Sequence, residues 1–193
     1  MTQDLPVTFI YVAIKYIITM TKKELENELI KIMSTESDYL IPNHNEVYQK
    51  VITELIKPIK NLSATKIVAI DMKGLMYGPI VAHRLKLPFV PILKGNKIKL
   101  RKSVIKGNTF IDYSKSKKSI EVFRNSIKKN DKIILIDDWF DSGKTGKSAI
   151  KLIEKLGGKV IAISVIFNQL KPKDKDFFDK YNYHFLVQLK PKS

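Results

Sequence analysis

The stretch from Lys132 to Gly158 constrains the fold of this chain more than any other. It begins with a continuous apolar run (KIILI), which is typical of a strand buried on both faces of a parallel sheet. Residues 145–156 then follow a helical pattern that ends at Gly157 and Gly158, since glycine readily closes a helix. A buried strand, a turn and a helix in this order predict one unit of a parallel α/β sheet.

The same order of elements recurs along the chain. Apolar runs predict further strands at Lys66–Asp71, Pro88–Leu93, Val160–Phe167 and Phe185–Leu189, and an edge strand at Ile120–Phe123. Helical spacing predicts helices at Thr21–Met33, at Asn43–Ile59 and up to Leu85 after Gly78. The sequence therefore predicts an α/β fold with a doubly wound, mostly parallel sheet.

Length and cysteine content limit the number of domains and the class of protein. A chain of 193 residues can build one α/β domain and is short for two. We expect an apolar arm or extension over residues 1–19 and a single domain over residues 20–193, because Thr21 and Glu24 have the spacing of a helix capping box. The chain has no cysteine, which excludes disulfides and a thiolate nucleophile and suits the cytoplasm.

The net charge of +16 predicts attraction to polyanions, from nucleic acids to small phosphorylated substrates, without choosing between them. The stretch Lys94–Lys118 is rich in lysine and contains Gly95 and Gly107, which predicts a basic flexible loop or ribbon. The apolar stretch Leu5–Met20 is shorter than the ~20 residues that span a bilayer, so we expect no membrane association.

Two adjacent acids, Asp137 and Asp138, follow the strongest predicted strand. Buried carboxylates are costly unless something uses them, and they can accept hydrogen bonds from vicinal sugar hydroxyls. The turn Ser142–Thr145 precedes a helix whose first N–H groups favour an anion, so a sugar phosphate would bind both halves. A structural role or direct Mg²⁺ binding of the acid pair stays open. A P-loop is excluded because Asp138 stands where its first glycine is required.

The stretch Ile133–Thr145 resembles the signature of type I phosphoribosyltransferases that binds 5-phosphoribosyl pyrophosphate (PRPP). The resemblance implies that Asp137 and Asp138 bind the ribose hydroxyls of PRPP. It implies Mg²⁺ as a cofactor that reaches these two acids only indirectly, through PRPP. The residues implied for the 5′-phosphate are Ser142, Gly143, Lys144 and Thr145.

A second motif, Asp71-Met72-Lys73-Gly74, is similar to the pyrophosphate loop of hypoxanthine-guanine phosphoribosyltransferases. That resemblance implies a cis peptide between Met72 and Lys73 and a catalytic role for Lys73. The stretch from Gly74 to Lys97 resembles adenine phosphoribosyltransferases, in which a Gly-x-x-x-Gly-Pro run leads to a strand that ends in basic residues. The residues implied for pyrophosphate are Met72, Lys73, Gly74 and Lys94.

Asp141 bears on the choice of base. The family's 6-oxopurine enzymes usually carry Asp at this place, near N7 of the base. The resemblance therefore favours a 6-oxopurine as the substrate and implies that Asp141 is a catalytic residue. Alternatively, Asp141 caps the following helix. The product would be a nucleoside monophosphate of purine salvage. Adenine is the first alternative, although the Glu-Tyr pair that adenine enzymes carry in a flexible loop is absent around Tyr113.

A second alternative is a regulatory protein of the same fold that senses PRPP or a nucleotide and binds nucleic acid in a salt-dependent manner. If the chain is an enzyme, its expected partners are PRPP and a purine base, both small-molecule substrates. The family resemblance also implies a homodimer.

Overall fold

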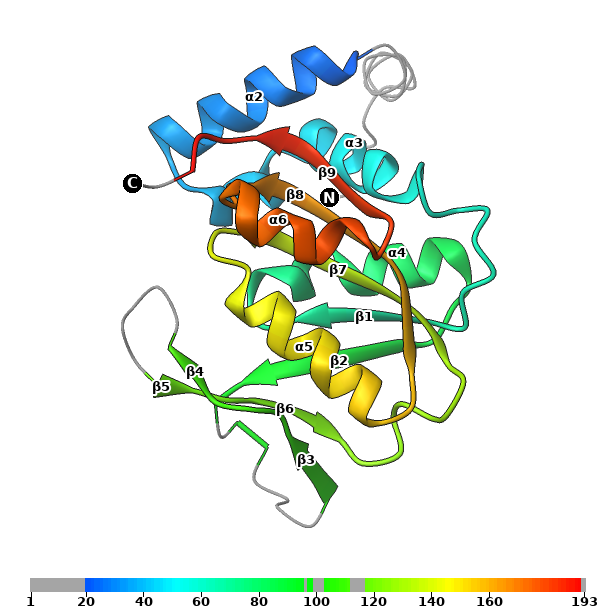
Figure 1. The fold of residues 1–193 in the computed structure, drawn as a ribbon. Coiled ribbons are helices and arrows are strands. Elements are labelled where there is room, and N and C mark those ends of the chain that lie inside the picture. Colours follow the sequence, from blue (N-terminus) through cyan, green and yellow to red (C-terminus); the bar gives the residue numbers. More distant parts are fainter. Residues whose placement is uncertain (1–19, 96, 99–102, 112–116, 192–193) are drawn as a thin grey trace, which may run out of the picture. The chain divides into compact units, whose positions relative to one another are not determined.

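The structure is a computed structural model that describes residues 20–95, 97–98, 103–111 and 117–191 (Figure 1). The chain divides into two compact units, Met1–Glu54 and Leu55–Ser193, and each is described by itself. Residues 1–19 lie outside the described residues, so the arm expected there and the single domain expected over residues 20–193 stay predictions. Within the described residues, no helix is both long and apolar enough to cross a membrane.

The first unit contains helix α2 (Lys22–Thr35), which begins where the capping pattern predicts. Thr21 Oγ1 accepts a hydrogen bond from Glu24 N, and the Glu24 carboxylate accepts one from Thr21 N. A 3₁₀ helix, η1 (Asp38–Asn43), follows and leads to α3 (Asn45–Ile56), which ends in the second unit. Both helices predicted in this part of the chain are confirmed.

The second unit is built on a seven-stranded sheet with the order β3-β6-β2-β1-β7-β8-β9 (Figure 1). The parallel strands are β2 (Phe89–Lys94), β1 (Lys66–Ile70), β7 (Lys132–Phe140), β8 (Lys159–Asn168) and β9 (Tyr183–Gln188). The antiparallel strands are β6 (Ile120–Phe123) and β3 (Val104–Lys106). A separate ribbon pairs β4 (Phe110–Ile111) with β5 (Lys117–Lys118).

Helices cover both faces of this sheet. They are η2 (Lys73–Met76), α4 (Gly78–Leu85), α5 (Lys144–Lys155) and α6 (Pro172–Asp179). Successive side chains of a strand point to opposite faces. On β1, Val68 belongs to the core that contains Ile150 of α5, whereas a Cβ added at Gly78 of α4 would lie 2.4 Å from Ala69 Cβ. The predicted doubly wound α/β fold is thereby confirmed.

Three segments differ from the expectation. Ile120–Phe123 is not an edge strand, because β3, which comes from the predicted basic loop, pairs with its outer side. β7 continues past the acid pair to Phe140, because β8 pairs with it as far as Asn168. Helix α6 was not predicted. The flexibility expected for residues 94–118 stays a prediction, and parts of that stretch lie outside the described residues.

Candidate active site

The carboxyl ends of β1 and β7 lie where the connections of the parallel sheet diverge. β1 pairs with β2 on one side and with β7 on the other, and the chain leaves β1 through α4 and β7 through α5, on opposite faces. Such a switch point leaves a crevice in which ligands of open α/β sheets bind. Both predicted motifs lie here: residues 71–74 follow β1, and residues 137–145 form the end of β7 and the next turn.

Asp137 and Asp138 lie in β7 just beyond Ile136, the last residue paired with β1. They are 5% and 8% exposed, and Asp138 N donates a hydrogen bond to Asp137 Oδ1 at 3.0 Å. Burial, and then the negative charge of Asp138, raise the pKa of Asp137 well above its ordinary value, while the positive charge of Lys94 lowers it in part. A buried acid in this situation is unfavourable for the isolated fold and indicates a functional site.

Lys73 and Gly74 bring the first motif against the acid pair. Lys73 Nζ lies 2.7 Å from Asp138 Oδ2 and 5.5 Å from the centre of the Trp139 ring. A Cβ added at Gly74 would lie 2.7 Å from Asp137 Oδ1, so this approach requires glycine. The two motifs, distant in sequence, are therefore in direct contact.

The cis peptide of this loop joins Asp71 to Met72. The predicted position between Met72 and Lys73 is therefore wrong by one residue, because β1 ends at Ile70 and the chain turns out of the sheet immediately after it. The Met72 side chain is exposed, in contrast to the side chains on either side of it.

Asp71 is a buried residue of the site that the sequence analysis did not assign. Its Oδ2 accepts a hydrogen bond from Lys94 N at 3.1 Å and forms an ion pair with Lys97. Asp71 therefore holds the end of β2, with the candidate pyrophosphate residue Lys94, beside the loop after β1. An acid directly after a buried strand was the available signal.

Gly143 shapes the turn between β7 and α5. Its φ of +67° lies in the region that favours glycine, and an added Cβ would lie 2.6 Å from the Phe178 ring. The first N–H groups of α5, which starts at Lys144, have no carbonyl one turn earlier to bind. They are available to an anion such as a phosphate.

The predicted phosphate residues occupy this turn. Ser142 and Lys144 are exposed, and Thr145 is half-buried, so a ligand can approach them from solvent. Asp141 is half-buried. The N-cap residue of α5 is Gly143, two residues after Asp141.

Trp139 and Asn168 organise the edge of the site. The Trp139 ring lies 4.9 Å from that of Phe167, and its Nε1 donates a hydrogen bond to Gln169 Oε1 at 3.2 Å, so this side chain packs on its neighbours. Asn168 is fully buried and accepts a hydrogen bond from the Tyr183 hydroxyl at 2.9 Å. Burial raises the pKa of Tyr183, which keeps it a donor. This network could not be predicted from the sequence, since one Asn at a strand end carries no distinctive pattern.

Within the described residues, no group of three or more His, Cys, Asp or Glu side chains is placed to hold a metal ion. Asp137 and Asp138 supply two neighbouring carboxylates. Oxygen ligands of this kind suit Mg²⁺, which commonly takes one or two carboxylates together with phosphates of a substrate. The residues present therefore fit an ion that arrives with a phosphorylated ligand.

Comparison with protein families gives a match to the phosphoribosyl transferase domain over residues 41–192. The adenine phosphoribosyltransferase of Clostridium botulinum is 32% identical over 143 residues, which cover 74% of this chain and 81% of that protein. The adenine phosphoribosyltransferase of Desulfosudis oleivorans is 28% identical over 141 residues, which cover 73% of this chain and 79% of that protein.

Comparison with solved structures also finds similarity to adenine phosphoribosyltransferases. The Giardia lamblia APRTase complexed with 9-deazaadenine has a TM-score of 0.72 at 25% identity, covering 89% of this chain and 99% of that one. The Trypanosoma brucei adenine enzyme, in complex with AMP, pyrophosphate and ribose-5-phosphate, has a TM-score of 0.68 at 25% identity, covering 77% and 67%. The Rhodothermus marinus enzyme shares the fold with a TM-score of 0.70 at 24% identity, covering 79% and 85%.

Proposed function

The chain belongs to the phosphoribosyltransferase family and is an enzyme of its purine class, and from this premise we propose that it transfers the 5-phosphoribosyl group of PRPP to adenine. The observation that carries the proposal is the contact between the two motifs. Lys73 pairs with Asp138 while Gly74 lies against Asp137. PRPP needs this combination, because its pyrophosphate leaves from the carbon beside the ribose hydroxyls.

In the proposed complex, Asp137 and Asp138 accept hydrogen bonds from the ribose hydroxyls. The 5′-phosphate binds the turn at the start of α5 and the pyrophosphate binds the loop after β1. The 5′-phosphate residues are Ser142, Gly143, Lys144 and Thr145, and the pyrophosphate residues are Met72, Lys73, Gly74 and Lys94. Mg²⁺ bound to PRPP would neutralise pyrophosphate charge, with Asp137 and Asp138 contacting it only through PRPP.

The reaction forms a bond between the purine nitrogen and C1′ of the ribose while the bond from C1′ to the pyrophosphate oxygen breaks. The electron pair of the broken bond leaves with pyrophosphate, so negative charge grows beside Lys73 and Lys94, which stabilise it. The ring proton that the purine loses needs an acceptor, and Asp141 is the candidate. The product is a nucleoside monophosphate.

Adenine replaces the 6-oxopurine favoured by the sequence analysis. Asp141 was the reason for that preference, but the relatives described above are named adenine enzymes, so the preference is not supported. In place of the Glu-Tyr pair of adenine enzymes, the sequence has Asp112, one methylene shorter than Glu, before Tyr113. Both residues lie outside the described residues.

Pyrophosphate release with PRPP, Mg²⁺ and each of adenine, hypoxanthine, guanine and xanthine tests the proposal. We expect turnover with adenine and a loss of turnover in Asp138→Asn. Lys190→Gln, a substitution at an exposed lysine, is the control and should retain turnover. Turnover only with an oxopurine would refute the choice of base. Binding of PRPP without turnover on any base would refute the enzyme assignment.

We also propose a homodimer in the cytoplasm, following the family resemblance and the absence of cysteine. Light scattering during size-exclusion chromatography measures the mass in solution. A mass near twice 22.2 kDa is expected for the dimer.

A further inference from the structure

The edge of the sheet opposite the candidate site carries concentrated positive charge. β7 and β8 begin there with Lys132 and Lys159, which are Cα partners on adjacent strands. Lys128 and Lys129 lie in the turn before β7, next to the start of β8, since Asn130 N donates to Gly157 O at 2.9 Å. All four lysines are exposed, so two segments distant in sequence build one basic surface.

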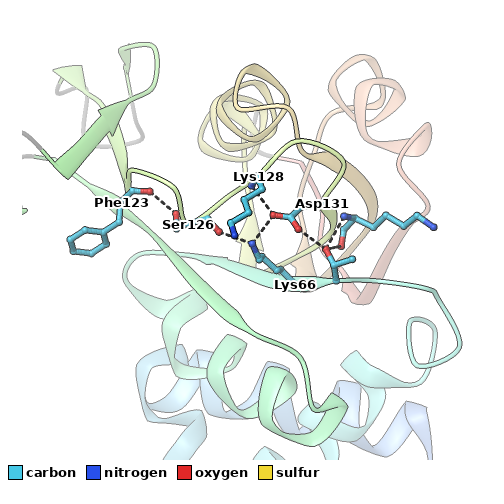
Figure 2. A network of polar contacts seen from close by, with 7 residues as sticks. Lys66, Phe123, Ser126, Lys128 and Asp131 are labelled. Atoms are coloured by element: carbon cyan, nitrogen blue, oxygen red, sulfur yellow. Dashed lines mark hydrogen bonds and ion pairs between the residues drawn. The ribbon is translucent and has the colours of Figure 1, made fainter.

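An exposed aromatic ring lies near the same edge. Phe123, the last residue of β6, directly precedes the turn to Ser126, whose carbonyl oxygen accepts a hydrogen bond from Lys66 Nζ at the start of β1. The Phe123 side chain is 40% exposed. Figure 2 shows Phe123 at one end of a chain of polar contacts that continues through Ser126 to Lys66 and Asp131. We call Phe123 and the four lysines Lys128, Lys129, Lys132 and Lys159 the amino-edge surface.

The polar contacts fix the backbone of this surface (Figure 2). Ser126 Oγ donates to Phe123 O at 2.6 Å, and Lys66 Nζ donates to Ser126 O at 3.0 Å. Lys66 Nζ also lies 2.6 Å from Asp131 Oδ2, which accepts a further hydrogen bond from Lys128 N at 2.7 Å. The backbone at Phe123 and at Lys128 is therefore tied through Ser126 and Asp131 to the start of β1.

Asp131 does not neutralise the surface lysines. Burial raises its pKa, but hydrogen bonds from Lys66, the Lys128 N–H and Thr65 outweigh this and hold the pKa below its ordinary value. The negative charge of Asp131 is therefore paired with Lys66. In the part of the chain that the structure describes, Lys128, Lys129 and Lys159 have no ion pair. Like charges on adjacent strands are unfavourable unless an anion lies between them.

We propose that the amino-edge surface binds single-stranded nucleic acid, with Phe123 stacking on a base and the lysines contacting successive phosphates. Basic grooves that carry exposed aromatic rings bind single strands in this way. A membrane is the less suitable anionic partner, because one ring offers too little apolar area for the interfacial burial that anchors a protein. A duplex is also less suitable, because its bases are stacked and unavailable to Phe123.

This surface is separate from the candidate active site. Lys132 and Asp138 are six residues apart on β7, which corresponds to about 20 Å of strand. Substitutions at the amino-edge surface should therefore leave phosphoribosyl transfer unchanged. That activity reports whether a variant is folded.

Fluorescence anisotropy with a labelled oligouridine RNA and an oligothymidine DNA, each of about twelve nucleotides, tests the proposal. Four lysine–phosphate contacts predict a log–log salt slope of about −2.8, or about 50-fold weaker binding on raising salt from about 50 to about 200 mM. The variant Lys128→Gln/Lys129→Gln/Lys132→Gln/Lys159→Gln should remove most of this slope, and Phe123→Ala should weaken binding about tenfold. Tighter binding of the RNA or of the DNA would show which sugar the surface prefers, and either result supports the proposal.

A charge-matched control carries glutamine at four exposed lysines elsewhere: Lys22, Lys23, Lys31 and Lys173. It should bind with the slope of the unaltered protein, and both quadruple variants should keep full turnover. Equal losses in the two quadruple variants would overturn the site, because the total charge alone would then explain binding. Inorganic polyphosphate or phosphatidylserine vesicles binding as tightly as RNA, with Phe123→Ala without effect on RNA, would overturn the nucleic-acid assignment.

Discussion

Gly74→Ala tests whether the contact between the two motifs builds the active site. The added Cβ would lie 2.7 Å from Asp137 Oδ1 and 3.3 Å from Ile136 O, whereas ordinary contacts begin near 3.4 Å. The loop or the carboxylate must therefore move by about 0.7 Å, and overpacking of this kind costs about 1–3 kcal/mol of stability. Since a misplacement of about 1 Å can reduce a rate about 100-fold, we expect kcat/KM for PRPP to fall by roughly that factor.

Gly158→Ala is the matched control. Its Cβ would lie 2.9 Å from Ile127 Cγ2, a similar overlap in the turn before β8, far from the acid pair. Thermal unfolding and PRPP-dependent turnover are measured for both variants. We expect comparable losses of stability, but kcat/KM within about threefold of the unaltered enzyme only for Gly158→Ala. A folded Gly74→Ala enzyme with unchanged kcat/KM would refute the reasoning.

Three further predictions follow from single residues. Asp137→Asn should abolish turnover and raise stability by about 1–2 kcal/mol at neutral pH. Because the folded state raises the pKa of Asp137, its carboxyl holds a proton more tightly than in the unfolded chain, so stability falls as pH rises from the ordinary Asp value to the raised one. The advantage of the variant, measured by urea unfolding, should therefore grow with pH and shrink near about pH 4. Lys73→Met should lower kcat/KM about 100- to 1,000-fold and lower the melting temperature, and Lys73→Met/Asp138→Asn should restore the melting temperature but not turnover. Thr21→Ala removes the side-chain acceptor of Glu24 N and should cost about 1 kcal/mol, measured by circular dichroism of thermal unfolding.

The parallel strands could be predicted because their signal is local. A strand buried on both faces is a continuous apolar run, and β1, β7 and β8 each contain one. The true end of β7 could not be predicted, since it depends on pairing with β8. Helix α6 has too few apolar residues, chiefly Phe177 and Phe178, to show a helical period.

The site was predicted to the extent that topology brings strand ends together. Motifs after β1 and β7 must meet at one edge of the sheet, so the proximity of Lys73 to Asp138 followed from their positions. The ion pair between Asp71 and Lys97 joins two loops whose lengths do not determine their contact, and it required the structure. The base could not be decided, because Asp141 is one residue and its effect depends on surroundings that a sequence pattern does not describe.

The charges of the site explain why we propose PRPP, and not one of its parts, as its ligand. Lys73 neutralises Asp138 in the structure, and both side chains are largely buried, at 20% and 12% exposure. Pyrophosphate alone would attract Lys73 and leave Asp138 buried without its cation, while a ribose diol alone would compete with Lys73 for the same carboxylate. Leaving a buried polar group unsatisfied costs about 1–3 kcal/mol. In the proposed complex PRPP would avoid that cost, because it would present the anion to Lys73 and the hydroxyls to Asp138 together.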